Sequence, residues 1–109
     1  MAEEDKIEEQ LNSKNQAFVL FYESWCPFSQ RFLPVFNRFA ENQTRECIKV
    51  VADFKSNVCD KYSVEVFPTV LFFEKGKVAK RLDGEAGEGL NQAKLEAFAK
   101  NVSLMRFGA

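Results

Sequence analysis

The chain has 109 residues, a length that fits one domain over 1–109, and 46% of them are hydrophobic, with twelve phenylalanines available for a core. A net charge of −1 without a basic face argues against nucleic acid as a partner, and the lack of histidine excludes Ser–His and Cys–His catalysis within the chain. Without histidine or a Cys-x-x-Cys pair we expect no metal site, and no cofactor is indicated.

The first predicted elements are a helix and a strand. Residues 3–13 predict a charged helix with Ile7 and Leu11 facing inward. Residues 17–22, AFVLFY, are continuously apolar, which is typical of a central strand covered on both faces.

The next helix is predicted to begin at Pro27, since proline fits a first helical position. Pro34 lies inside its pattern and is expected to kink the helix without ending it. The apolar stripe of this helix consists of Phe32, Phe36, Phe39 and Ala40.

The second half of the chain predicts a strand at 47–52 and a short helix at 56–63, with Ser56 as its candidate N-cap. Residues 64–82 predict a hairpin whose turn is the sequence KGK, and 91–105 predict a final amphipathic helix. The inward side of that helix carries Leu95, Phe98, Ala99 and Val102.

The predicted order is α-β-α-β-α-β-β-α. Two strands joined through a helix of this length should be parallel, with a right-handed crossover, and the hairpin adds antiparallel strands. We therefore expect an α/β fold with a small mixed sheet and helices on both faces.

Four positions have a spacing that belongs to a known family. WCPFS stands where the first strand meets the next helix, Pro34 follows Cys26 by eight residues, VFPT opens a strand at Pro68, and Gly84 comes sixteen residues later. With these features, residues 17–102 resemble the thioredoxin superfamily, and YSVEVFPTVLFFEKGK is similar to protein disulfide isomerase domains. The resemblance implies a thioredoxin-like sheet of about four strands and a cis peptide bond before Pro68.

The chain departs from that family in three ways. It has no room for the N-terminal strand, so we expect that strand to be absent. Leu20 stands where relatives keep a buried carboxylate, although Lys49, which would neighbour that carboxylate, is present. Ser29 replaces the second, resolving cysteine, which leaves a Cys-x-x-Ser motif.

Cys26 at a helix start is the candidate nucleophile. Free N–H groups, those of Phe28 and Ser29, are expected to point toward the sulfur and stabilise its thiolate. The Ser29 hydroxyl can donate a further hydrogen bond, and we expect a reactive, partly exposed thiol.

The reaction open to Cys26 is attack on a disulfide of a protein or of glutathione. Ser29 cannot displace the bound partner, so we expect the mixed disulfide to persist until an external thiol or a reductase acts. The sequence thus predicts a monothiol thiol-disulfide exchange protein, a candidate oxidoreductase in redox homeostasis. The alternative is a thioredoxin-like binding or chaperone module that holds or traps partner proteins without catalysis.

A substrate groove is implied by the resemblance. Phe67 is expected to pair its backbone with an extended partner strand. The FSQ of residues 28–30 is similar to a disulfide-isomerase relative of the endoplasmic reticulum that captures client thiols. The residues expected to form this groove are Trp25, Pro27, Phe28, Phe67, Pro68 and Gly84.

Each of the three thiols also has a less reactive interpretation. Cys47 and Cys59 are interpreted as small buried hydrophobic residues, with a disulfide between them left open, and Cys26 itself has a buried structural role as its alternative. Trp25 is expected either in the core or on the rim of the groove.

The sequence also bears on location and assembly. The longest apolar run is too short to span a membrane, so no membrane partner is expected. The start, MAEEDKIEEQ, is unlike a signal peptide, and the final LMRFGA carries no retention tetrapeptide. We therefore expect a cytoplasmic monomer, with a dimer linked through Cys26 as the alternative.

Overall fold

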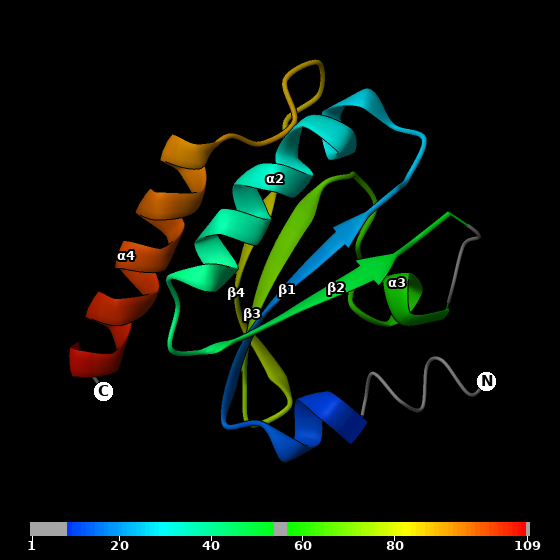
Figure 1. Cartoon of the computed structure of the whole chain (residues 1–109). Helices are drawn as coiled ribbons and strands as arrows, with labels where there is room; N and C mark the ends of the chain where they lie inside the picture. The colour runs from blue at the N-terminus through cyan, green and yellow to red at the C-terminus, as the bar shows by residue number, and fades with distance from the viewer. Residues whose placement is uncertain (1–8, 54–56, 109) are drawn as a thin grey trace.

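The computed structural model describes the backbone of residues 9–53 and 57–108, and the side chains of 9–53 and 58–103. The elements follow the predicted order after a helical segment at 9–13 (Figure 1). They are β1 (Gln16–Tyr22), α2 (Pro27–Glu41), β2 (Glu46–Val51), α3 (Asn57–Lys61), β3 (Thr69–Glu74), β4 (Lys77–Asp83) and α4 (Gln92–Gly108). Ile7 and the candidate cap Ser56 lie outside the described residues. No helix in the described ranges is long and apolar enough to cross a membrane.

The strands form one mixed sheet in the order β2-β1-β3-β4. β1 and β2 are parallel, while β3 is antiparallel to both β1 and β4, as predicted. Phe21 pairs with Thr69, and Thr69 pairs with Asp83. The segments that follow β1 and β4 and the segment that precedes β3 therefore meet at one end of the sheet.

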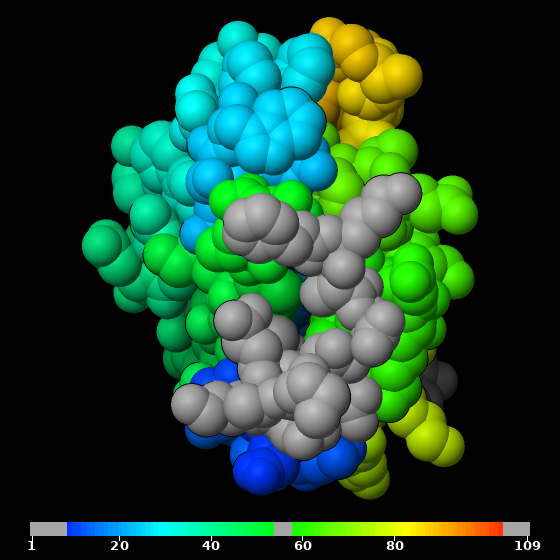
Figure 2. Space-filling model, turned by 90° about the vertical axis from the view of Figure 1, so that its right-hand side faces the viewer, coloured from blue at the N-terminus to red at the C-terminus, as the bar shows by residue number. Residues whose placement is uncertain are grey.

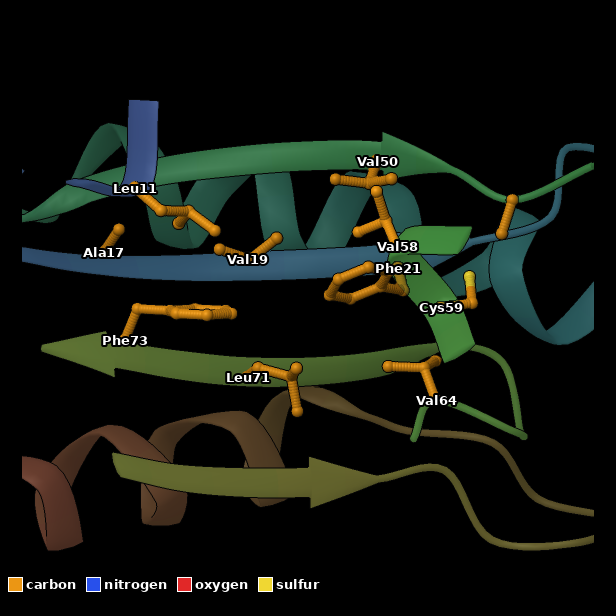
Figure 3. Packing of buried hydrophobic residues seen from close by; sticks show 11 residues of the cluster. Leu11, Ala17, Val19, Phe21, Val50, Val58, Cys59, Val64, Leu71 and Phe73 are labelled. Atoms are coloured by element: carbon orange, nitrogen blue, oxygen red, sulfur yellow. The ribbon is translucent and has the colours of Figure 1, made fainter. Parts of the chain in front are cut away.

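β1 is covered on both faces, as its continuous apolar sequence predicted. Phe18 and Leu20 point toward α2 and α4, whereas Val19 and Phe21 point toward α3 and Leu11. Figure 3 shows the cluster on the α3 side, and Figure 1 shows α2 and α4 on the opposite face. The alternation follows from the two-residue period of a strand.

Phe18 lies at the centre of the cluster beneath α2 and α4, with none of its surface exposed. Its ring centroid is 5.1 Å from that of Phe39, 5.0 Å from Phe72 and 6.1 Å from Phe98. These partners come from α2, β3 and α4, so one side chain joins three elements to β1. The helix α2 continues through Pro34, which is exposed.

The hairpin differs from the prediction at its start. Strand β3 begins at Thr69, whereas the apolar pattern predicted a strand from Val64. Ser63 takes a left-handed φ of 55°, and the Val64 N–H donates to the carbonyl of Cys59, which keeps these residues in the turn after α3. Pro68 also has no N–H with which to extend the ladder.

Candidate functional site

Cys26 occupies the N-cap position of α2, with Pro27 as the first helical residue. Its carbonyl accepts the first helical hydrogen bond from the Gln30 N–H at 2.9 Å, so the thiol stands at the helix start as predicted. The cysteine is 9% exposed, which covers it more than the sequence led us to expect. Its side chain makes no capping hydrogen bond, so the predicted contacts from the Phe28 and Ser29 N–H groups to the sulfur are absent.

Ser29 is fully buried one turn into α2. Its Oγ accepts a hydrogen bond from the Glu23 N–H at 3.2 Å, and the Cys26 N–H donates to the Glu23 carbonyl at 3.2 Å. No hydrogen bond joins Ser29 to Cys26, both of which belong to the described chain, contrary to the contact that we expected. The serine instead fastens the loop before the cysteine to the helix.

A second set of contacts holds the same loop, from Asp53 after β2 and from Gln30 on α2. The Ser24 N–H and hydroxyl donate to the two carboxylate oxygens of Asp53, at 2.7 and 2.5 Å, and the Gln30 side-chain amide donates to the Ser24 carbonyl at 2.9 Å. Asp53 was not among the site residues predicted from the sequence. Its only signal was a polar residue just past a strand parallel to β1, where carboxyl ends share one edge of the sheet.

Leu20 fills its position with an apolar side chain that has no exposed surface. It pairs in register with Lys49 on β2, so the lysine is its neighbour as predicted. The Lys49 ammonium donates to Asn37 Oδ1 on α2 at 2.9 Å. The chain therefore has no carboxylate at position 20, and the Lys49 ammonium is hydrogen-bonded to Asn37.

The three rim aromatics differ in exposure. Trp25 is 64% exposed, which supports the rim over the core as its place. Phe28 is half-buried under the Arg31 guanidinium, whose carbon is 5.1 Å from the ring centroid. Phe67 is half-buried against the cluster on the α3 side.

A pocket of about 450 Å³ opens beside Phe67. Ala52, Cys59, Val64 and Phe67 give it apolar walls, and the carboxylates of Glu23, Asp53, Asp60 and Glu65 line the remainder. Partial burial, and then the neighbouring negative charge of Asp53, raise the pKa of the Glu23 carboxyl above its ordinary value.

The predicted groove residues Pro68 and Gly84 are in contact. The Phe67–Pro68 peptide bond is cis, as the resemblance implied. A Cβ on Gly84 would lie 2.5 Å from the Pro68 carbonyl oxygen, so the close approach of the two segments requires glycine. Gly89 similarly leaves room for Phe28, since a Cβ there would lie 2.9 Å from the Phe28 Cβ. Figure 2 shows the start of α2 and the loop after β4 side by side at one end of the molecule.

Gly84→Ala should destabilise the fold by about 1–3 kcal/mol, because the new methyl group meets backbone that cannot turn aside. Gly87→Ala is the matched control: a Cβ at Gly87 meets nothing within 4 Å, and only its φ of +79° carries a cost, of about 1 kcal/mol. Urea unfolding of both variants checks this. Equal losses would contradict a steric role for the Pro68 contact.

The other two thiols lie on opposite faces of the sheet. Cys59 is buried in the cluster on the α3 side, as predicted, while Cys47 is half-buried toward α2 and α4. No disulfide joins any of the three cysteines, all of which the structure describes. The sheet itself separates Cys47 from Cys59, which argues against the disulfide left open between them.

Cys47 should resist alkylation near neutral pH. Burial, and then the nearby Glu46 carboxylate, raise the pKa of its thiol from 9.0 to about 11. Because the folded state favours the protonated form, the thiolate fraction at pH 8 should be about a hundredfold lower than in the unfolded chain. In a Cys26→Ala, Cys59→Ala variant, iodoacetamide should react at least about tenfold more slowly without urea than with it. Similar rates would contradict the shift.

Comparison of the chain with known proteins shows which family it belongs to. The thioredoxin family model matches residues 1–101. Human endoplasmic reticulum resident protein 44 is 33% identical over 86 residues, which are 71% of this chain and 21% of that protein. Thioredoxin H5 of Arabidopsis thaliana is 29% identical over 89 residues, which are 81% of this chain and 75% of that protein. Mouse protein disulfide-isomerase A5 is 27% identical over 90 residues, which are 77% of this chain and 17% of that protein.

Solved structures agree with the fold. Plasmodium falciparum thioredoxin superposes with a TM-score of 0.77 at 21% identity, covering 90% of each chain. Fasciola hepatica thioredoxin gives 0.73 at 26% identity, covering 92% of this chain and 91% of that one.

The chain therefore belongs to the thioredoxin family, whose mixed sheet and flanking helices it shares. It is a thioredoxin-like protein that is homologous to protein disulfide isomerases and thioredoxins. It spans about a fifth of the length of the matched endoplasmic reticulum protein and three quarters of that of the plant thioredoxin.

Proposed function

We propose that the chain is a monothiol thiol-disulfide exchange protein that captures disulfide-bonded partners through Cys26. The observation that carries the proposal is the pairing of a cysteine at the helix N-cap with a fully buried serine where a dithiol protein would hold its second sulfur. The N–H groups of the first helical turn lie at the same end of α2 and favour negative charge there.

The exchange proceeds in two balanced steps. The Cys26 thiol first loses its proton to solvent, and its thiolate attacks one sulfur of a partner disulfide, so that a Cys26–partner disulfide forms and the other partner sulfur leaves as a thiolate. An external thiolate, such as that of glutathione, then attacks the mixed disulfide. It bonds to the partner sulfur and returns Cys26 as a thiolate.

The second step needs an outside thiol because Ser29 offers only an oxygen. That oxygen is buried and accepts the Glu23 N–H. Leu20, which is buried where relatives keep a carboxylate, likewise lacks a group that could take a proton from a resolving thiol. Both features affect the release of the partner and leave the capture step intact.

The test uses a peptide joined to glutathione by a disulfide, with products followed by mass spectrometry under non-reducing conditions. The parent protein should form a Cys26 adduct that, once the small thiols released in its formation have been removed by gel filtration, persists until glutathione is added. Cys26→Ala should form none, while the Cys47→Ala control should match the parent.

Two results would count against the proposal. An adduct that clears without added thiol would contradict the monothiol mechanism. No adduct at all, with peptide binding retained in both the parent and Cys26→Ala, would instead favour the alternative of a binding module.

A further inference from the structure

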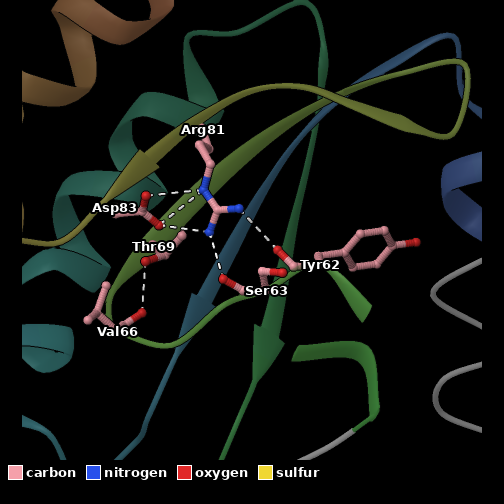
Figure 4. Close-up of polar contacts among 6 residues, drawn as sticks. All are labelled: Tyr62, Ser63, Val66, Thr69, Arg81 and Asp83. Carbon is pink, nitrogen blue, oxygen red and sulfur yellow. Dashed lines mark hydrogen bonds and ion pairs between the residues drawn. The ribbon is translucent and has the colours of Figure 1, made fainter. Parts of the chain in front are cut away.

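Arg81 on β4 binds the turn that ends α3 (Figure 4). Its Nη1 donates to the Tyr62 carbonyl at 3.2 Å and its Nη2 to the Ser63 carbonyl at 2.9 Å. The Asp83 carboxylate accepts from Nε at 3.1 Å and from Nη2 at 2.9 Å, which fixes the plane of the guanidinium. Lysine could not make this set of contacts, because it lacks the planar fork of donors.

The turn that Arg81 binds has an uncommon backbone. The Ser63 N–H donates to the Asp60 carbonyl at 3.2 Å, and the Val64 N–H donates to the Cys59 carbonyl at 2.8 Å, which together form a Schellman closure of α3. Glycine usually takes the left-handed position of this motif, but here serine does, at φ 55°. The carbonyls of Tyr62 and Ser63 lie at and beyond the end of the helix, and Arg81 donates to both.

The other end of the segment 62–68 is held by the residue that follows β4 and by the first residue of β3. Gly84, next to Asp83, packs against the Pro68 carbonyl, and the Thr69 hydroxyl donates to the Val66 carbonyl at 2.7 Å. The segment is therefore held at its start by Arg81 of β4, and at its end by Gly84, which follows β4, and by Thr69 of β3. Val66 between them is 41% exposed, so the outer side of the segment stays open to a partner.

We propose that Arg81 is a positioning residue for exchange at Cys26. By holding the start of the segment 62–68, it keeps the Phe67 backbone in the place where an extended partner peptide pairs with it. Because the segment is already ordered, little conformational entropy is lost there when a peptide binds, and the peptide binds more tightly. Arg81 thus acts on peptide binding and leaves the intrinsic reaction of the thiol unchanged. The inference rests on the proposed function, because it assumes that disulfide-bearing peptides react at Cys26.

The experiment compares two reagents on Cys26, with modification followed by peptide mapping. The first is a peptide whose cysteine carries a thiopyridyl disulfide, from which attack on the peptide sulfur releases thiopyridine. The second is iodoacetamide, which needs no groove. For Arg81→Gln, the half-saturating peptide concentration should rise about tenfold, while the maximal rate and the iodoacetamide rate stay within about twofold.

The controls separate positioning from general stability. Lys80→Gln, an exposed neighbour on β4, should leave both reagents unaffected. Arg81→Lys should raise the half-saturating peptide concentration by an intermediate amount. If Arg81→Gln does not fold, the half-saturating concentration and the iodoacetamide rate of Arg81→Lys decide the question. An unchanged half-saturating concentration, or an equal fall in both rates, would overturn the inference.

Failure of the proposed function has a different signature. In that case the unsubstituted protein would be alkylated at Cys26 and yet not react with the peptide disulfide, and the inference would fall with it.

Discussion

Under the proposed monothiol mechanism, Ser29→Cys is expected to let the protein release a captured partner without an added thiol. The new thiol would stand one helical turn from Cys26, at a position that is already inside the protein. Release of a peptide bound to Cys26 should become at least about 100-fold faster without added thiol, because an attached thiol acts at a far higher effective concentration than a dissolved one. Reduction of insulin in the presence of a dithiol reductant should rise with it.

The matched control for this gain is Ser13→Cys, which adds a thiol at the other end of the sheet and should not speed release. If Ser29→Cys still holds its partner, Leu20→Asp in the same background tests whether the missing carboxylate limits the step. Burying that carboxylate should cost several kcal/mol, on the order of 3–5, so folding is checked by circular dichroism. Continued retention by a folded double variant would contradict the assignment of the defect to the release step.

Phe18→Ala is expected to cost about 3–5 kcal/mol of unfolding free energy. The ring contacts aromatic side chains from three other elements, and its removal leaves a cavity that all of them line. A domain of this kind has about 5–15 kcal/mol in total, so the variant should be close to unfolding at 37 °C.

The comparison for Phe18→Ala is Phe18→Leu, which keeps much of the volume and should lose only about 1–2 kcal/mol. Urea unfolding with an unchanged slope measures both. A loss below about 1 kcal/mol for the alanine variant would mean that the helices repack over β1.

The sheet could be predicted because its signals are local. The apolar run AFVLFY is enough to predict a strand that is buried on both faces of the sheet. A helix between two strands implies that the two strands are parallel. The start of β3 was predicted too early because the backbone there is decided elsewhere. Arg81, which lies 18 residues after Ser63, binds the turn that keeps this segment out of the sheet.

The candidate site was predictable only in part, for a similar reason. Cys26 and Ser29 are three residues apart on one helix, so their spacing is visible in the sequence. Asp53 holds Ser24 from 29 residues away, and that contact exists only once β1 and β2 are side by side. The small exposure of Cys26 is a further product of packing that no motif could supply.

The buried hydroxyl of Ser29 has a consequence for how such proteins can diverge. Serine and cysteine codons can differ by a single nucleotide, so under the proposed function one nucleotide change would separate a form that holds its partner from a form that releases it. The exchange is not free of structural effect, since sulfur is a weaker acceptor than oxygen for the Glu23 N–H. A lineage that gains the second thiol would therefore loosen the loop before Cys26, and a lineage that loses it would tighten that loop.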